Sequence, residues 1–401
     1  MTYKPTLPPV TTPNEKPNNR AILQAKFAVD MLSGVTNLKS PDRAVRLGEL
    51  LESGLFAVDS SGLLVPKGSA TADTSAISSG RNLLINGDFN TYTRGTSSAL
   101  ASIGGELLGP DRWVYAGFGI TGNWGLGTDT TGTLPHSRYF MGFNVATVAA
   151  GAAAWVGQKI ERVAPTAGNK VTISFWMRSN VAGKKVGIRM QQVFGTGGSV
   201  SPAVDTLGKV ITLTTTFQKY THTYSLPSVA GKSFGSNEND YLYVLFDLCG
   251  PVFGSELVGQ TGLFELGEVQ VELGSVAHEF DVTPLAQQRE NCNRYTEEII
   301  VNRFVGVTFT PNGDSRAVIP FATRKRVAPV ITPVGFTSIN LVGFGRSGEF
   351  VNLDSGNLQW QSTVDAAVIT GVGNISGISP SGIVVVWSTT SSIRLIADAE
   401  F

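Results

Sequence analysis

The feature that most constrains this chain is an alternation of apolar and polar side chains with a period of two residues. It is clearest at 171–178, where Val-Thr-Ile-Ser-Phe-Trp-Met-Arg has an apolar residue at every second position, and it recurs at 186–191 and 241–248. Successive side chains of a β-strand point to opposite faces of a sheet, so each segment is expected to bury one face and present the other. The predicted inward residues are Val171, Ile173, Phe175, Met177, Val186, Ile188, Met190, Leu242, Val244, Phe246 and Leu248.

The composition favours the same fold class. The 401 residues include 46 glycines, and only 15% are charged, against about a quarter in average proteins. Such a composition is typical of many short strands joined by tight turns. The length is sufficient for two or three domains, each with its own core.

The charge balance and the cysteines exclude several classes of function. Lys+Arg and Asp+Glu number 31 each, so no excess charge attracts the chain to nucleic acid. No apolar run is long enough for a membrane span, so membrane insertion is not expected. Cys249 and Cys292 lie in different predicted segments without CxxC spacing, which favours separate thiols over a disulfide or a zinc site.

The N-terminal region differs from the rest of the chain. Prolines are frequent in residues 1–18, which predicts an extended arm. Helix-capping residues predict short helices at about 19–32 and 40–51. Two short helices bury little surface alone, so we expect this region to dock on a partner or to form a trimer. A linker is expected at 61–81, with one strand pair at 55–65.

Short blocks in the middle of the chain resemble the carbohydrate-binding-module-like jelly roll of tailed-bacteriophage fibre proteins. They are Asn82–Phe89, Asp111–Trp113, Gln158–Glu161, Ile173–Arg178, Phe217–Tyr220, Ser225–Pro227 and Val269–Gly274 with Phe280. The segments Cys292–Tyr295, Arg324–Pro329 and Ile396–Phe401 resemble the C-terminal head of such fibres.

This resemblance implies a mainly β chain with a fixed order of parts. A short α-helical attachment region at 1–60 and the linker would precede a jelly-roll β-sandwich at 82–286 and a C-terminal β-sandwich at 287–401, the receptor-binding tip. It further implies a virion protein, a homotrimeric tail fibre that binds other virion proteins through its N-terminal region. Its remaining partner would be the polysaccharide of the host cell surface.

A glycan-binding face needs flat aromatic rings and planar amide, guanidinium or carboxylate groups. The outward positions of the alternating segments would supply this set on one sheet face. The candidate residues are Trp176, Arg178, Arg189, Gln191, Tyr241, Tyr243 and Asp247. Alternatively, these side chains pack under loops or against a neighbouring subunit. Trp124 and Trp155 lie near predicted loops as further ligand platforms, whereas Trp113 is expected to be structural.

Metal binding and catalysis have less support. Asp88 and Glu268 fall where related sugar-binding sandwiches hold a structural calcium, but Ca²⁺ takes about six to eight oxygen ligands, so no cofactor is expected. Neither an HExxH nor a Walker sequence is present, and no catalytic residue is assigned. His222 lies in an alternating run and is expected to be half-buried, and the basic run 324–326 is expected to be a solvated turn.

Two other functions stay open beside the non-enzymatic tail fibre. One is a head fibre, decoration protein or structural connector without receptor binding. The other is a capsule-degrading tailspike enzyme, which would need two carboxylates at a fixed separation. Its candidate carboxylates are Glu161, Asp205, Asp247, Glu265 and Glu268.

Overall fold

The computed structural model describes residues 81–401 apart from 102–104, 302, 309–314, 335–337, 345–349, 355–357, 372–382, 388–392 and 401, together with two earlier strands. The chain divides into two compact units, Met1–Ile77 and Ser78–Phe401. In the first unit, β1 (Phe56–Val58) pairs antiparallel with β2 (Leu64–Pro66), which confirms the predicted strand pair. The helices predicted at 19–32 and 40–51 lie outside the described residues.

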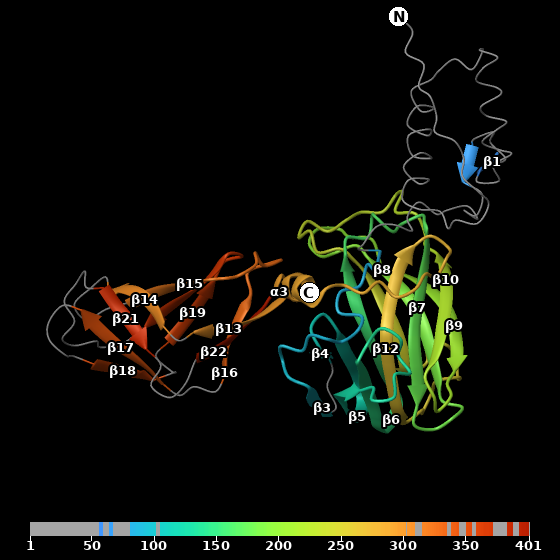
Figure 1. Cartoon of the computed structure of the whole chain (residues 1–401), viewed down its shortest axis with the longest axis horizontal. Coiled ribbons are helices and arrows are strands. Elements are labelled where there is room, and N and C mark those ends of the chain that lie inside the picture. Colours follow the sequence, from blue (N-terminus) through green and yellow to red (C-terminus); the bar gives the residue numbers. More distant parts are fainter. Residues whose placement is uncertain are drawn as a thin grey trace, which may run out of the picture. The chain divides into compact units, whose positions relative to one another are not determined.

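The second unit begins with a mainly antiparallel β-sandwich (Figure 1), and the predicted fold class is confirmed. Its strands are β3 (Ser97–Ala101), β4 (Gly105–Leu108), β5 (Val114–Thr128), β6 (Tyr139–Glu161), β7 (Lys170–Ser179), β8 (Lys185–Val193), β9 (Val204–Thr212), β10 (Gln218–Ser225), β11 (Tyr241–Cys249) and β12 (Gly262–Leu273). The paired order is β10-β7-β12-β6-β11-β8-β9, and β5 joins through β6.

The long β5–β6 hairpin belongs to both layers of the sandwich. The first part of β6 pairs with β12, and its last part, from Ala154 to Glu161, pairs with β11. Between these parts the pairing of β5 with β6 shifts register at Gly119, whose φ of +65° suits a residue without a Cβ. We call β10, β7, β12 and the first part of β6 the first layer, and the last part of β6 with β11, β8 and β9 the second layer.

The two layers meet in one apolar core. The rings of Phe175 on β7 and Phe246 on β11 lie 4.9 Å apart between their centroids. All of the predicted inward side chains are buried, so the alternating pattern correctly identifies the core face of each strand. Burial of each such side chain contributes about 1.5–3 kcal/mol.

Two of the predicted loop tryptophans belong to the interior. Trp113 is fully buried, and its indole Nε1 donates a hydrogen bond to the carbonyl oxygen of Asn86 at 2.8 Å, which confirms its structural role. Trp124 lies on β5 and is also buried, so its expected role as a loop platform is wrong.

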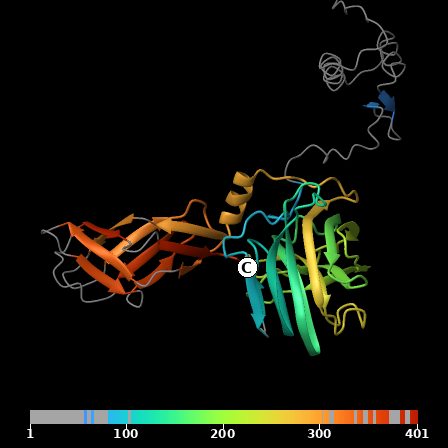
Figure 2. The same cartoon turned by 60° about the horizontal axis from the view of Figure 1, so that its bottom comes forward.

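A short helix and two further sheets follow the sandwich (Figures 1 and 2). Helix α3 spans Leu285–Asn293. A three-stranded sheet contains β13 (Thr296–Val301), β22 (Ile393–Asp398) and β16 (Val330–Val334), and a seven-stranded sheet contains β14 (Arg303–Thr308), β15 (Ser315–Pro320), β17 (Ser338–Phe344), β18 (Phe350–Asp354), β19 (Leu358–Ser362), β20 (Ala366–Gly371) and β21 (Ile383–Trp387). The domain boundaries at 82–286 and 287–401 stay predictions.

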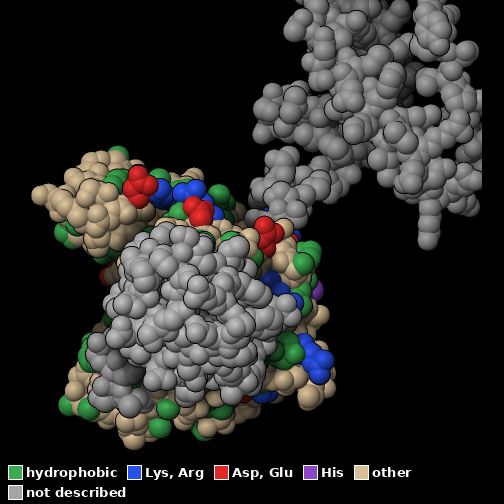
Figure 3. All heavy atoms as spheres, turned by 90° about the vertical axis from the view of Figure 1, so that its left-hand side faces the viewer, with side chains coloured by type: hydrophobic (Ala, Val, Ile, Leu, Met, Phe, Trp, Pro, Cys, Tyr) green, Lys and Arg blue, Asp and Glu red, His purple; other side chains and the backbone are tan. Residues whose placement is uncertain are grey.

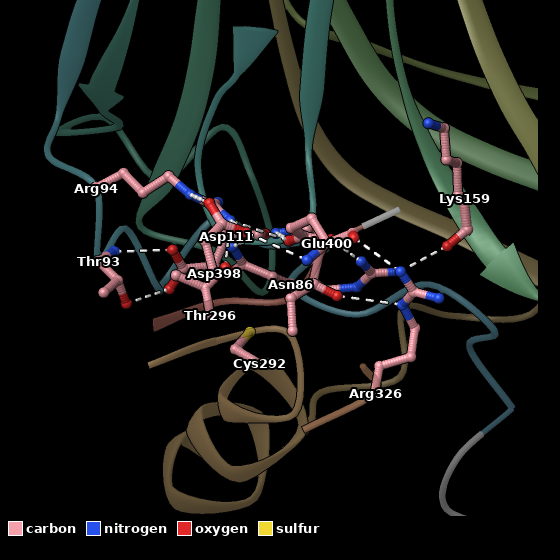
Figure 4. Close-up of polar contacts among 12 residues, drawn as sticks. Asn86, Thr93, Arg94, Asp111, Lys159, Cys292, Thr296, Arg326, Asp398 and Glu400 are labelled. Atoms are coloured by element: carbon pink, nitrogen blue, oxygen red, sulfur yellow. Dashed lines mark hydrogen bonds and ion pairs between the residues drawn. The ribbon is translucent and has the colours of Figure 1, made fainter. Parts of the chain in front are cut away.

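Ion pairs join Asp398 at the end of β22 and Glu400 after it to two segments of the sandwich, the one before β3 and the one between β4 and β5 (Figure 4). Arg94 donates to both oxygens of Asp398 at 3.1 Å, and Arg112 pairs with Glu400 through its side chain. The Arg112 side chain is 2% exposed and that of Glu400 8% exposed. Arg112 Nη2 also donates to the carbonyl oxygen of Lys159 on β6 at 2.6 Å, so the ion pairs connect the C-terminal sheet directly to the second layer.

The basic run 324–326 also takes part in this region. Lys325 is 1% exposed and pairs with Glu297, and its Nζ donates to the carbonyl oxygen of Asn293 at 2.5 Å. Burial lowers the pKa of Lys325 from its ordinary value. Arg326 donates to the backbone oxygen of Glu400 at 2.7 Å. The expected solvated turn is therefore wrong for Lys325 and Arg326, because both are held by acceptors from distant segments.

Within the described part of the chain, no helix has both the length and the apolar character that a membrane span requires.

Candidate functional site

The seven candidate glycan-binding residues lie on two opposite faces of the sandwich. Trp176 and Arg178 belong to β7 in the first layer, and the other five belong to β8 and β11 in the second layer. Because Phe175 and Phe246 meet in the core, the side chains that alternate with them point away from each other. The expectation of a single face is therefore wrong.

The first-layer pair packs locally. Arg178 Nε donates to Glu265 Oε2 at 2.6 Å, and its guanidinium carbon lies 4.4 Å from the centroid of the Phe217 ring. Trp176 packs against a small cluster that contains Phe217 and Phe140. Both side chains thus have partners within the sandwich, which fits the alternative of packing under neighbouring segments.

The second-layer residues form a polar network around Arg189. Its Nε donates to Asp247 Oδ2 at 2.8 Å, and its Nη1 donates to Asp205 Oδ1 at 2.7 Å. Gln191 Nε2 donates to the same Asp205 carboxylate at 3.2 Å. Burial raises the pKa of Asp247, although the hydrogen bond from Arg189 opposes this shift. The network fixes an amide, a guanidinium and two carboxylates on adjacent strands.

Aromatic rings lie beside this network. The rings of Tyr241 and Tyr243 are 5.9 Å apart in an edge arrangement, and Lys159 Nζ lies 5.1 and 5.3 Å from their centroids. Trp155 on β6 stands opposite Asp247 in register, next to the exposed Phe118 at 6.3 Å. Trp155 therefore lies on a strand and not in the predicted loop. We call Trp155, Lys159, Arg189, Gln191, Asp205, Tyr241, Tyr243 and Asp247 the second-layer face.

A glycine shapes this face. A Cβ atom at Gly157, between Trp155 and Lys159, would lie 2.8 Å from Tyr243 Cε2. The Tyr243 ring therefore leans over the backbone of β6, where only glycine leaves room for it. The sequence prediction offered Trp155 only as a loop platform and did not include Lys159 and Asp205 in the binding set, although Trp155 and Lys159 follow the same alternation as the other outward residues.

Asp88 and Glu268, the two residues that fall where related sandwiches hold calcium, have hydrogen-bond partners within the chain. Glu268 Oε1 accepts backbone N–H groups from His136 at 2.5 Å and Ser137 at 2.9 Å. Asp88 Oδ1 accepts the side-chain amide of Gln288 at 2.7 Å. No cluster of three or more His, Cys, Asp or Glu suited to a metal is present among the residues that could be described.

The histidines serve local structure. His278 Nδ1 lies 2.6 Å from Glu272 Oε2, and its backbone N–H donates to the other oxygen of that carboxylate at 2.9 Å. His136 faces Glu268 in the same manner, with Nδ1 at 3.4 Å from Oε2. His222 is half-buried, as expected, and burial lowers its pKa.

A sequence match to the nucleophile-elbow pattern was missed by the sequence prediction. Gly-Lys-Ser-Phe-Gly at 231–235 has the G-x-S-x-G form. The segment lies in the connection between β10 and β11, whereas an elbow requires a strand followed directly by a helix. The backbone N–H of Ser233 donates to Ser201 Oγ at 3.0 Å, so the segment is better described as a hydrogen-bonded loop.

On the side of the molecule seen in Figure 3, the acidic and basic side chains of the described residues stand next to one another and form no patch of a single sign. This distribution agrees with the equal totals of acidic and basic residues in the sequence.

No family model matches the sequence, and no curated protein matches it. Similar solved structures include the enzymatically active domain of tailspike protein 4 from bacteriophage CBA120, with 16% identity over 48% of this chain and 22% of that chain and a TM-score of 0.30. A xylan-binding domain from Paenibacillus barcinonensis shows 13% identity over 50% of this chain and all of that chain, with a TM-score of 0.29. A cyclase from Fischerella shows 14% identity over 48% of this chain and 96% of that chain, with a TM-score of 0.30.

Proposed function

We propose that this chain is a virion fibre protein that binds a host-cell glycan on the second-layer face without cleaving it. The fibre assignment, the attachment to other virion proteins and the homotrimer rest on the sequence blocks that resemble phage fibres. The glycan assignment rests on one observation, the Arg189 network beside the half-buried rings of Trp155 and Tyr241.

The arrangement combines the two kinds of group that sugars require. Aromatic rings contact the apolar faces of sugar rings, and fixed polar groups bind the hydroxyls. Arg189 already holds Asp205 and Asp247, so these groups lose little further conformational freedom when a ligand binds. Three linked copies would then convert weak single-site contacts into stable adsorption.

Cleavage is the second candidate, and Asp247 is the observation that supports it. A glycosidase needs one carboxylic acid with a raised pKa and a second carboxylate nearby. Burial raises the pKa of Asp247, and Asp205 shares its arginine. However, Asp247 is 3% exposed and both of its oxygens accept hydrogen bonds from Arg189, at 2.8 and 3.4 Å. The Arg189 guanidinium is thus bonded to the carboxylate that would have to act as the general acid. This arrangement favours glycan binding over glycan cleavage.

The test is competition for phage adsorption to host cells by the full-length protein. Two variants on opposite faces provide a matched comparison, Trp155→Ala in the second layer and Trp176→Ala in the first. We expect the parent protein and Trp176→Ala to reduce adsorption, and Trp155→Ala to lose most of this effect while its circular dichroism is unchanged.

Other results would refute the proposal. If the folded parent protein does not reduce adsorption, the structural connector or decoration role is favoured. If Trp176→Ala loses blocking and Trp155→Ala retains it, the site lies on the opposite face. Release of reducing ends from host polysaccharide, abolished by Asp247→Asn, would establish the enzyme instead.

A further inference from the structure

A polar pocket lies where the second-layer face ends. Its volume is about 400 Å³, within the range of about 300–1,000 Å³ that is typical of small-ligand sites. The lining residues come from the end of β6, the loop before β11 and the segments after α3 and before β16. They are Glu161, Arg162, Ser236, Asn237, Glu238, Asp240, Arg294, Arg326 and Val327.

The pocket is continuous with the second-layer face along β6. Trp155, Lys159 and Glu161 occupy alternate outward positions of this strand, and Glu161 stands opposite Tyr241 in register. The outward row therefore leads from the aromatic rings directly to the pocket wall. A saccharide chain that lies along this row would place one of its residues in the pocket.

The guanidinium groups in the pocket come from three separate segments. Arg162 follows β6, Arg294 follows α3, and Arg326 precedes β16. Arg326 donates to the backbone oxygens of Ala399 and Glu400 at 3.2 and 2.7 Å, which fixes it on the C-terminal side. Arginine is the side chain best suited to bind a carboxylate, since its planar fork matches both oxygens.

The carboxylates of the lining differ in how firmly they are held. Asp240 is buried: its Oδ2 accepts the backbone N–H of Val163 at 2.8 Å, and its Oδ1 accepts Arg162 Nη1 at 3.3 Å. Glu161 accepts Arg294 at 3.1 Å. Glu238, by contrast, is 79% exposed and reaches Arg162 at 3.2 Å, where the Arg162 side chain is 53% exposed. Such a solvent-exposed pair contributes little and is readily exchanged.

We infer that this pocket is the subsite for an acidic sugar residue, whose carboxylate replaces Glu238 on Arg162 while its hydroxyls bind Ser236 and Asn237. The inference rests on the proposed glycan-binding function and specifies its ligand as an acidic polysaccharide. It also makes the site composite, since Arg294 and Arg326 come from beyond the sandwich.

The test uses the full-length protein and saturation-transfer NMR titrations. The probes are D-glucuronate, D-galacturonate and N-acetylneuraminate, each compared with its uncharged methyl ester. We expect at least one acid to bind roughly 10-fold more tightly than its ester, since a hydrogen bond to a charged group is lost in the ester. Arg162→Gln should abolish this preference.

Arg394→Gln is the matched control. Arg394 is 48% exposed and pairs with Glu298, so it resembles Arg162 in exposure and in having a partly exposed glutamate partner, but it lies on β22. It should keep the preference for the acid, and Arg162→Lys should keep part of it, because the charge remains and the planar fork is lost.

The outcomes separate this inference from the proposed function. The acidic subsite is overturned if every acid binds as tightly as its ester. It is also overturned if Arg162→Gln and Arg394→Gln lose the preference for the acid to the same extent. If adsorption is still blocked in a Trp155-dependent manner in either case, the glycan face stands without the subsite. If adsorption is not blocked either, the proposed function also fails.

Discussion

Replacement of Glu400 by glutamine tests whether the C-terminal sheet is held to the sandwich by a buried ion pair. Glu400 receives the backbone N–H of Arg112 at 3.1 Å, the Arg112 side chain and Arg94 Nη2 at 3.4 Å. Glu400→Gln keeps the shape of the side chain and removes its negative charge. Arg112 would then be left as a buried cation without its partner carboxylate.

The expected cost follows from burial. The Arg112 and Glu400 side chains are 2% and 8% exposed, so solvent screens their interaction poorly. Removal of one partner of a buried pair typically destabilises a protein by about 3–5 kcal/mol. Arg94, which Glu400 also contacts, keeps its ion pair with Asp398 in the variant, which places the expected loss at the lower end, about 3 kcal/mol.

The assay is urea unfolding followed by tryptophan fluorescence. Trp113 is buried directly after Arg112 and hydrogen-bonds to Asn86, so it contributes a signal from this region to the emission of the six tryptophans. Glu298→Gln removes a carboxylate from a more exposed pair with Arg394, with side chains 31% and 48% exposed. Its loss should stay below about 1 kcal/mol.

The reasoning is refuted if Glu400→Gln changes the free energy of unfolding by no more than Glu298→Gln does. A separate, earlier transition in Glu400→Gln, followed by a main transition at the urea concentration of the parent protein, would show that the pair couples the sheets without stabilising the sandwich. Proteolysis before and after the first transition would identify which part has unfolded.

Further predictions concern the core and its thiol. Gln158→Met should destabilise the sandwich by about 2–4 kcal/mol in thermal unfolding. The reason is that the side-chain amide of Gln158 bonds the backbone N–H and C=O of Ile85 at 2.8 and 2.7 Å, and methionine cannot replace these bonds. An unchanged melting temperature would contradict this prediction. Burial raises the pKa of Cys292 from 9.0 to about 12, so its thiol should resist iodoacetamide at about pH 8 until the protein unfolds. The pKa of Cys292 is higher in the folded state than in the unfolded state, so the thiol destabilises the folded protein only when the pH rises above 9.0. Its contribution to the free energy of unfolding is therefore complete below pH 9.0 and is lost as the pH rises toward about 12. Alkaline unfolding of Cys292→Ser beside the parent protein would measure this loss.

The alternating pattern predicts the inward face of a strand well because side-chain direction is a local property of the backbone. It correctly placed Phe175 and Phe246 in the core. The layer to which a strand belongs depends on distant pairing, and here on the bend of β6. For this reason the pattern did not show that Trp176 and Asp247 lie on opposite faces of the sandwich.

The missed residues have specific physical causes. Gly157 and Gln158 interrupt the apolar pattern of β6, so the outward positions of Trp155 and Lys159 were not recognised as part of a strand face. Gln158 faces inward because Ile85, 73 positions earlier in the chain, satisfies its amide. Lys325 is buried because Glu297 lies on another strand, and no local sequence signal reports such a pairing.

Because β6 belongs to both layers, it also limits errors in the register of strand pairing. Displacement of β6 by one residue would turn Trp155 and Lys159 into the core and Val156 out of it, and it would do the same in the part of β6 that pairs with β12. Any such slip is therefore penalised in both layers at once. The 23-residue strand β6 thus fixes the register of both layers at once. The same register sets the position of Trp155 and Lys159 relative to the pocket at the end of β6.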